Sequence, residues 1–139
     1  MILVSSCLLG LSCRYDGVSK DYPQVLEYIK GKHYIPICPE QMGGLPTPRP
    51  PAEIVSLAPL SIQTQEADVT KEFVNGVEEV MKLSKFYKVE MAILKSKSPT
   101  CGRYQRYDGT FTRTLVEGSG IMAKELMKHN IKVINEEDL

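Results

Sequence analysis

Short continuous apolar segments recur along this chain, each bounded by polar or turn-forming residues. Four of them have the length and composition of buried β-strands, at Ile2–Ser6, Tyr34–Ile37, Val89–Leu94 and Ile131–Ile134. Continuous apolar strands are typical of parallel sheets, which are covered on both faces. The pattern therefore predicts a central sheet with a mostly parallel arrangement.

Between these strands, apolar residues recur at helical spacing. The segment Tyr22–Lys30 carries Val25, Leu26 and Ile29. A longer segment places Phe73, Val77, Val80, Met81 and Ser84 on one face, and a last helix opens after Gly118–Gly120 with Ile121, Met122 and Leu126. Strands that alternate with helices predict a three-layer α/β domain with a Rossmann-like or flavodoxin-like sheet.

Three segments interrupt this alternation. Gly43–Pro51 contains two glycines and four prolines around Arg49 and predicts a rigid loop. Ala52–Ser56 and Ser61–Gln65 have β-like composition, and Tyr107–Thr114 predicts an irregular hairpin or extended excursion.

Composition limits the classes of function. The chain has 139 residues and 42% hydrophobic residues, which predicts one domain, 1–139, with a real core. Lys plus Arg equals Asp plus Glu at 17 each, so we expect no nucleic-acid polymer as a partner. Met1 leads directly into a strand without a basic leader, and no apolar run is long enough for a membrane span. We therefore expect a cytoplasmic protein.

The cysteines carry the candidate chemistry. Four are too few for a disulfide scaffold, and three of them, Cys7, Cys38 and Cys101, each follow a predicted strand in a polar turn. Parallel α/β sheets bind ligands beyond the carboxyl ends of their strands. The pattern favours a shared cluster or metal site over three independent packing cysteines. Cys13 is a possible fourth ligand, and four thiolates would close a cluster for electron transfer.

Other residues allow competing interpretations. Cys7 and Arg14 resemble the phosphate-binding loop of low-molecular-weight tyrosine phosphatases, but six residues separate them here instead of five. The tetrapeptide Arg-Tyr-Asp-Gly occurs at 14–17 and 106–109, either as two ordinary turns or as a pair of substrate-contacting loops. Glu40 and Ser98 stand close to Cys38 and Cys101 and are candidates for proton transfer.

A series of short motifs resembles one known family. The segments are Cys7-Leu8-Leu9-Gly10, Arg14-Tyr15-Asp16-Gly17, Cys38-Pro39-Glu40, Gly43-Gly44-Leu45, Pro48-Arg49-Pro50-Pro51-Ala52-Glu53-Ile54, Leu94-Lys95, Ser98-Pro99-Thr100-Cys101-Gly102 and Tyr107-Asp108-Gly109-Thr110-Phe111. In this order they resemble the [4Fe-4S]-dependent thiouracil desulfidases, formerly a bacterial and archaeal domain of unknown function. The resemblance runs nearly end to end.

The resemblance implies an oxygen-sensitive [4Fe-4S] cluster held by three cysteines, with an acid and a serine that serve catalysis. The implied ligands are Cys7, Cys38 and Cys101, and the implied catalytic residues are Glu40 and Ser98, with Ser96 as the reserve. Cys13 matches a position where other members carry an apolar residue. The implied reaction is hydrolytic removal of sulfur from a thiolated base or nucleoside, with release of hydrogen sulfide. The alternatives are a cluster-bearing redox or sensing module and a zinc-stabilised small-molecule-binding domain.

Overall fold

Four parallel strands form the central sheet of the computed structural model, which describes residues 1–139. Their order is β2-β1-β5-β8, and their bounds are β1 Ile2–Ser5, β2 Tyr34–Ile37, β5 Met91–Leu94 and β8 Lys132–Asn135. Counted along the chain, this order is 2-1-3-4, as in the flavodoxin-like arrangement. The predicted parallel α/β sheet is confirmed.

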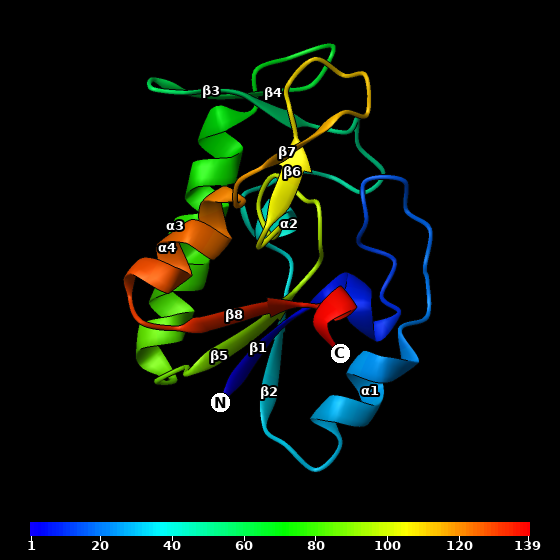
Figure 1. Cartoon of the computed structure of the whole chain (residues 1–139), viewed down its shortest axis with the longest axis vertical. Helices are drawn as coiled ribbons and strands as arrows, with labels where there is room; N and C mark the ends of the chain where they lie inside the picture. Colours follow the sequence, from blue (N-terminus) through cyan, green and yellow to red (C-terminus); the bar gives the residue numbers. More distant parts are fainter.

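Helices cover both faces of this sheet (Figure 1). Helix α1 (Pro23–Ile29) packs against one face, and α3 (Thr70–Phe86) and α4 (Ile121–Lys128) pack against the other. Successive strand residues point to opposite faces, so Leu3 joins the core with α3 and α4 while Val4 joins the core with α1. The prediction for α1 was wrong at one position, because Leu26 is 47% exposed and only Val25 and Ile29 face the core.

A one-turn helix, α2 (Pro39–Met42), stands where the sequence predicted only a polar turn after Cys38. It packs very closely on α3 through two glycines. A Cβ atom at Gly43 would collide with the carbonyl of Glu72, and one at Gly76 would collide with the carbonyl of Pro39. This contact fixes the position of Cys38, which is the N-cap residue of α2.

Two small antiparallel pairs lie beyond the carboxyl ends of the central strands (Figure 1). The first joins β3 (Glu53–Leu57) to β4 (Leu60–Gln63), and the second joins β6 (Gln105–Tyr107) to β7 (Leu115–Glu117). The hairpin predicted at 107–114 is therefore mainly the loop between β6 and β7. Two short 3-10 helices, η1 (Ser6–Leu9) and η2 (Glu136–Asp138), follow β1 and β8. None of the helices has the length and apolar character required to cross a membrane.

Candidate active site

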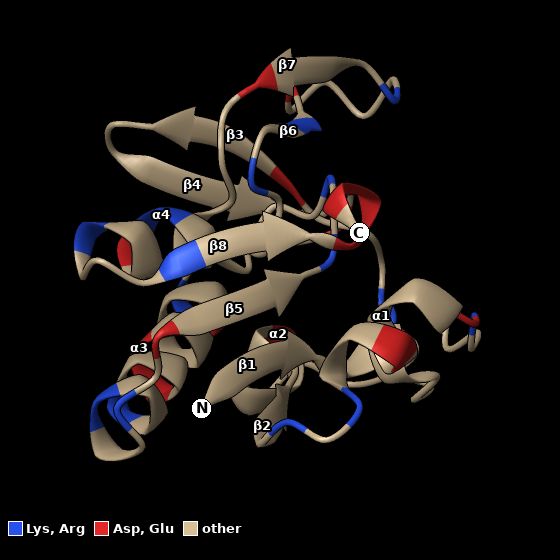
Figure 2. Ribbon diagram, turned by 60° about the horizontal axis from the view of Figure 1, so that its bottom comes forward, with Lys and Arg blue, Asp and Glu red and all other residues tan.

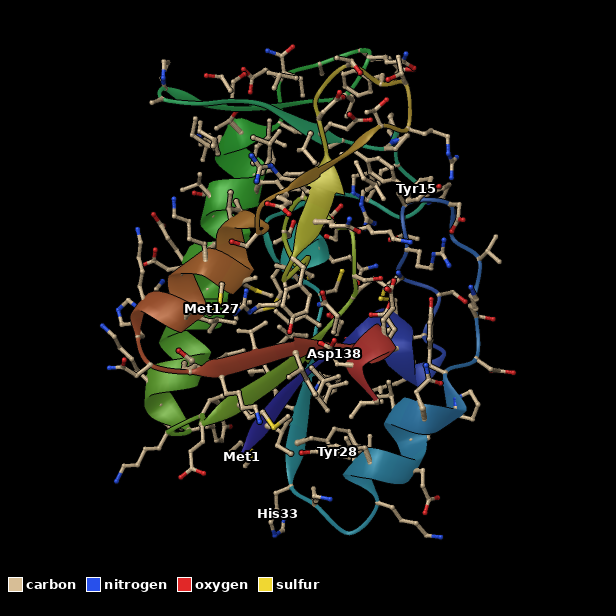
Figure 3. All side chains as sticks on the ribbon, in the orientation of Figure 1. Met1, Tyr15, Tyr28, His33, Met127 and Asp138 are labelled. Atoms are coloured by element: carbon tan, nitrogen blue, oxygen red, sulfur yellow. The ribbon has the colours of Figure 1, made fainter.

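A cavity of about 340 Å³ lies beyond the carboxyl ends of β1, β2 and β5. The neighbouring strands β1 and β5 flank the switch point of the sheet, where parallel α/β proteins bind ligands. In Figure 3, Tyr15 from the cavity wall and Asp138 lie at this end of the sheet, opposite Met1 and His33. The cavity wall contains every predicted site residue: Cys7, Cys38, Cys101, Glu40 and Ser98, together with Cys13 and Ser96.

All four cysteines are free thiols. Cys101 is 5% exposed and accepts a hydrogen bond from Ser5 Oγ at 3.6 Å, while Cys38 Sγ lies 3.9 Å from the carbonyl oxygen of Cys13. The thiols of Cys13 and Cys38 also lie close enough to influence each other's pKa. Residues 94 positions apart in the chain thus supply thiols to one cavity, because parallel strands end at the same edge of the sheet.

The protein environment raises the pKa of three of these thiols, Cys13, Cys38 and Cys101. Burial raises the pKa of Cys101 to about 12. The hydrogen bond with Cys38 lowers the pKa of Cys13, but the bond to Cys7 and burial outweigh it and raise that pKa to about 11. The bond with Cys13, followed by burial, raises the pKa of Cys38. A thiol with a raised pKa is a poor nucleophile, and a bound cation is what stabilises its thiolate.

The donor set fits a polynuclear cluster better than a single ion. No group of three Cys, His, Asp or Glu side chains is gathered closely enough to hold one metal ion. Zinc needs its ligands around one centre at about 2.0–2.3 Å, so this spacing does not favour the zinc-stabilised alternative. Each thiolate of an iron-sulfur cluster binds a different iron and lies farther from the next. Cys7, Cys38 and Cys101 come from three different segments of the cavity lining, after β1, β2 and β5, and so suit that requirement.

Glu40 lies in the cavity wall in the first turn of α2 and forms an ion pair with Arg49, Nε to Oε1 at 3.0 Å. Arg49 is 9% exposed and also donates to the carbonyl oxygen of Cys13 at 3.0 Å and to Thr47 Oγ1 at 2.9 Å. One guanidinium therefore connects the acid, the proline-rich loop and the Cys13 segment. From the sequence, Arg49 was expected in a rigid loop and in one of the family motifs, but its role at the site was not predicted.

The two candidate serines differ in their hydrogen bonds. Ser98 Oγ accepts the backbone N–H groups of Thr100 at 3.1 Å and Cys101 at 3.0 Å. Its side chain also acts on the Cys101 thiol, where hydrogen bonding from Ser98 acts to lower the pKa. Ser96 Oγ instead donates to Glu136 Oε1 and accepts from Lys95 Nζ at 3.1 Å. Ser98, unlike Ser96, is thus not held by a carboxylate.

The C-terminal segment holds the loop that carries these serines and Cys101. Asn135 donates to the carbonyl oxygens of Leu94 at 2.7 Å and Cys101 at 3.2 Å. Glu136 accepts the backbone N–H of Ser96 at 2.8 Å and pairs with Lys95 Nζ at 2.9 Å. Figure 2 shows the acidic C-terminal turn beside the basic segment that leaves β5. Sequence analysis missed both residues, because their contacts lie about 40 positions away in the chain.

Burial acts to raise the pKa of the Glu136 carboxyl, but hydrogen bonds from Ser96 and the ion pair with Lys95 outweigh it. The pKa of Glu136 is consequently lowered. The carboxylate is therefore charged throughout the neutral range and holds the Cys101 loop by charge-assisted hydrogen bonds.

The two Arg-Tyr-Asp-Gly segments share the hydrogen bond made by their aspartate, and both reach the cavity. Only the first is a β-turn, with the Gly17 N–H donating to the carbonyl oxygen of Arg14, because Arg106 and Tyr107 belong to β6. Asp16 Oδ1 accepts the N–H of Val18, and Asp108 Oδ1 accepts the N–H of Thr110, each at 3.0 Å. The cavity wall contains Arg14 and Tyr15 from the first segment and Tyr107 from the second. Both segments therefore lie at the cavity, and contact with a substrate stays a prediction.

Comparison with known proteins identifies the family. A family model described as 2-thiouracil desulfurase matches residues 2–138. The chain belongs to this family. The uncharacterized protein YbbK of Bacillus subtilis (strain 168) is 35% identical over 147 aligned positions, which cover 100% of this chain and 97% of YbbK.

A solved structure of the [4Fe-4S]-dependent thiouracil desulfidase TudS superposes with a TM-score of 0.87 at 38% sequence identity. The match covers 99% of this chain and 91% of the TudS chain. The resemblance drawn from the short motifs is confirmed, and neither the redox or sensing module nor the zinc-stabilised domain is favoured.

Proposed function

We propose that this chain hydrolytically removes sulfur from a thiolated pyrimidine, a thiouracil-like base or nucleoside, and releases hydrogen sulfide. The observation that carries the proposal is the convergence of three strand-end thiols, an acid and a serine on one cavity in a member of this family. The structural similarity to a [4Fe-4S]-dependent thiouracil desulfidase supports it. Residues 1–139 act as one domain in this proposal, and the partner is a small molecule, not a nucleic-acid polymer.

Cys7, Cys38 and Cys101 are the residues that would hold a [4Fe-4S] cluster. When bound through three thiolates, such a cluster supplies an iron without a protein ligand, a Lewis acid with affinity for sulfur. Cys13 remains a buried thiol in the same wall and is not one of the ligands. Its backbone carbonyl oxygen lies 3.9 Å from Cys38 Sγ.

Glu40 and Ser98 move the protons of the reaction. The Glu40 carboxylate, held by Arg49, takes a proton from the water that adds to the thiocarbonyl carbon. The Ser98 hydroxyl, whose oxygen is fixed by two backbone N–H groups, donates its hydrogen bond to the reacting atoms. The balanced reaction converts C=S and water into C=O and hydrogen sulfide, so it requires no net electron transfer.

Anaerobic reconstitution with iron and sulfide, followed by a sulfide-release assay with 2-thiouracil and 4-thiouracil, tests the proposal. We expect a brown protein that releases sulfide and that air bleaches, because oxygen attacks a cluster with an exposed iron. The Cys101→Ser variant is the matched control and should release none. Stoichiometric zinc uptake without iron, or a loaded cluster that leaves both thiouracils unchanged, would refute the proposal.

A further inference from the structure

Glu53 is a buried carboxylate in the cavity wall that lacks a cationic partner. It begins β3 and is 8% exposed. Its Oε1 atom accepts the backbone N–H groups of Gly109 at 2.9 Å and Phe111 at 3.3 Å. The other acids near the site, the half-buried Glu40 and the buried Glu136, are paired with Arg49 and Lys95. A buried carboxylate without a cation is costly unless hydrogen-bond donors compensate it.

The second oxygen of Glu53 is the informative atom. Oε2 accepts no hydrogen bond from the protein, yet it is not among the buried side-chain atoms without a partner, which are Tyr22 OH and Thr100 Oγ1. Oε2 is therefore accessible, and the accessible surface next to it is the cavity. An anionic acceptor in a confined cavity selects ligands that present an N–H or O–H donor.

We propose that Glu53 Oε2 accepts a hydrogen bond from a ring N–H of the substrate and thereby selects the heterocycle. This inference rests on the proposed function and deepens it. A thiouracil ring carries N–H donors beside its thiocarbonyl groups, whereas the N3 atom of cytosine is an acceptor. Three aromatic side chains, Tyr15, Tyr107 and Phe111, also line the cavity and offer flat surfaces to such a ring.

Glu53 has a structural role as well, because Oε1 anchors the loop between β6 and β7. The Glu53→Gln variant separates the two roles. Its carbonyl oxygen still accepts the N–H groups of Gly109 and Phe111, and this interaction directs the new NH₂ group to the former position of Oε2. The variant thus keeps the anchor and replaces an acceptor in the cavity by a donor.

The test is calorimetric titration of the anaerobically reconstituted protein with uracil, 1-methyluracil, 3-methyluracil and cytosine, none of which carries sulfur to be released. Wild-type protein should bind uracil about 10- to 100-fold more tightly than at least one N-methyl derivative, the usual effect of a hydrogen bond to a charged group. Glu53→Gln should lose this discrimination and shift its preference toward cytosine. Thr110→Val, which removes a hydrogen bond to Asp108 in the same loop, is the control and should keep the wild-type discrimination.

The outcomes separate this inference from the proposed function. If wild-type protein releases sulfide but binds uracil and both N-methyl derivatives equally, Glu53 does not select the ring and only this inference fails. The inference also fails if Glu53→Gln weakens binding of all four ligands by the same factor, since that result describes a loop anchor alone. A reconstituted protein that releases no sulfide and binds none of the pyrimidines would overturn the proposed function itself.

Discussion

Replacing Glu136 by alanine should destabilise the whole domain through the loop that carries Cys101. The change removes a carboxylate that is 5% exposed and accepts from the backbone and hydroxyl groups of Ser96. It leaves the Lys95 ammonium and the Ser96 N–H without their partner. Removal of one partner from a buried ion pair typically costs about 3–5 kcal/mol.

The lower end of that range applies here, because the Lys95 side chain is 25% exposed and water stabilises its charge. We therefore expect a loss of about 3 kcal/mol in the free energy of unfolding. A chain of 139 residues has an unfolding entropy of about 0.3 kcal/mol/K at its midpoint, so the melting temperature should fall by about 10 °C. Glu136→Gln keeps one hydrogen-bond acceptor and should lower the free energy of unfolding by about 1–2 kcal/mol.

Thermal unfolding of the cluster-free proteins, followed by circular dichroism, measures both losses. Glu137→Gln is the matched control. The Glu137 side chain is 59% exposed and its carboxylate lies 3.7 Å from Lys97 Nζ, so it should contribute less than about 1 kcal/mol to the free energy of unfolding. A Glu136→Ala protein that melts within 2 °C of the wild type at pH 7 would refute the conclusion that Glu136 holds the Cys101 loop.

The pH dependence gives a second check on the same group. The pKa of Glu136 is lower in the folded than in the unfolded protein, so the Glu136 carboxylate stabilises the fold fully above the ordinary carboxyl pKa of about 4.3. This stabilisation is lost as the pH falls from that value through the lowered pKa of the folded protein. The melting temperatures of wild type and Glu136→Gln should therefore converge in acid, and a gap that stays constant down to the acid limit would show that charge is not the cause.

Three further predictions concern the site. Serine at any one of the proposed ligands, Cys7, Cys38 or Cys101, should abolish retention of the cluster, measured by iron content and visible absorption. Cys13→Ser should retain most of the cluster, and its loss in that variant would favour four ligands and electron transfer. Glu40→Gln and Ser98→Ala should keep the cluster spectrum but slow sulfide release by about 100-fold or more, and wild-type rates would place proton transfer elsewhere. Arg49→Lys should also slow release with the cluster intact, because lysine cannot reproduce the forked hydrogen bonds, and an unchanged rate would remove Arg49 from the positioning of Glu40.

The sequence by itself determined the layers of the fold and the type of chemistry. Continuous apolar runs and helical spacing are local signals, so they located the four central strands to within two residues and the three covering helices. The three cysteines could be assigned to one edge of the sheet, because every parallel strand delivers its carboxyl end there. The short motifs identified the family.

Only the tertiary structure decided which side chains meet at the site. The strand order places β5 between β1 and β8, and this order brings Asn135 and Glu136 onto the loop that follows Leu94. The choice between Ser98 and Ser96 likewise depends on a hydrogen bond to Glu136, 40 positions away. Arg49 and Glu53 belong to one of the family motifs, but only the structure shows that both are buried beside the cavity. Hydrophobic periodicity records which face of an element is covered, but it carries no information on which distant polar group will lie opposite.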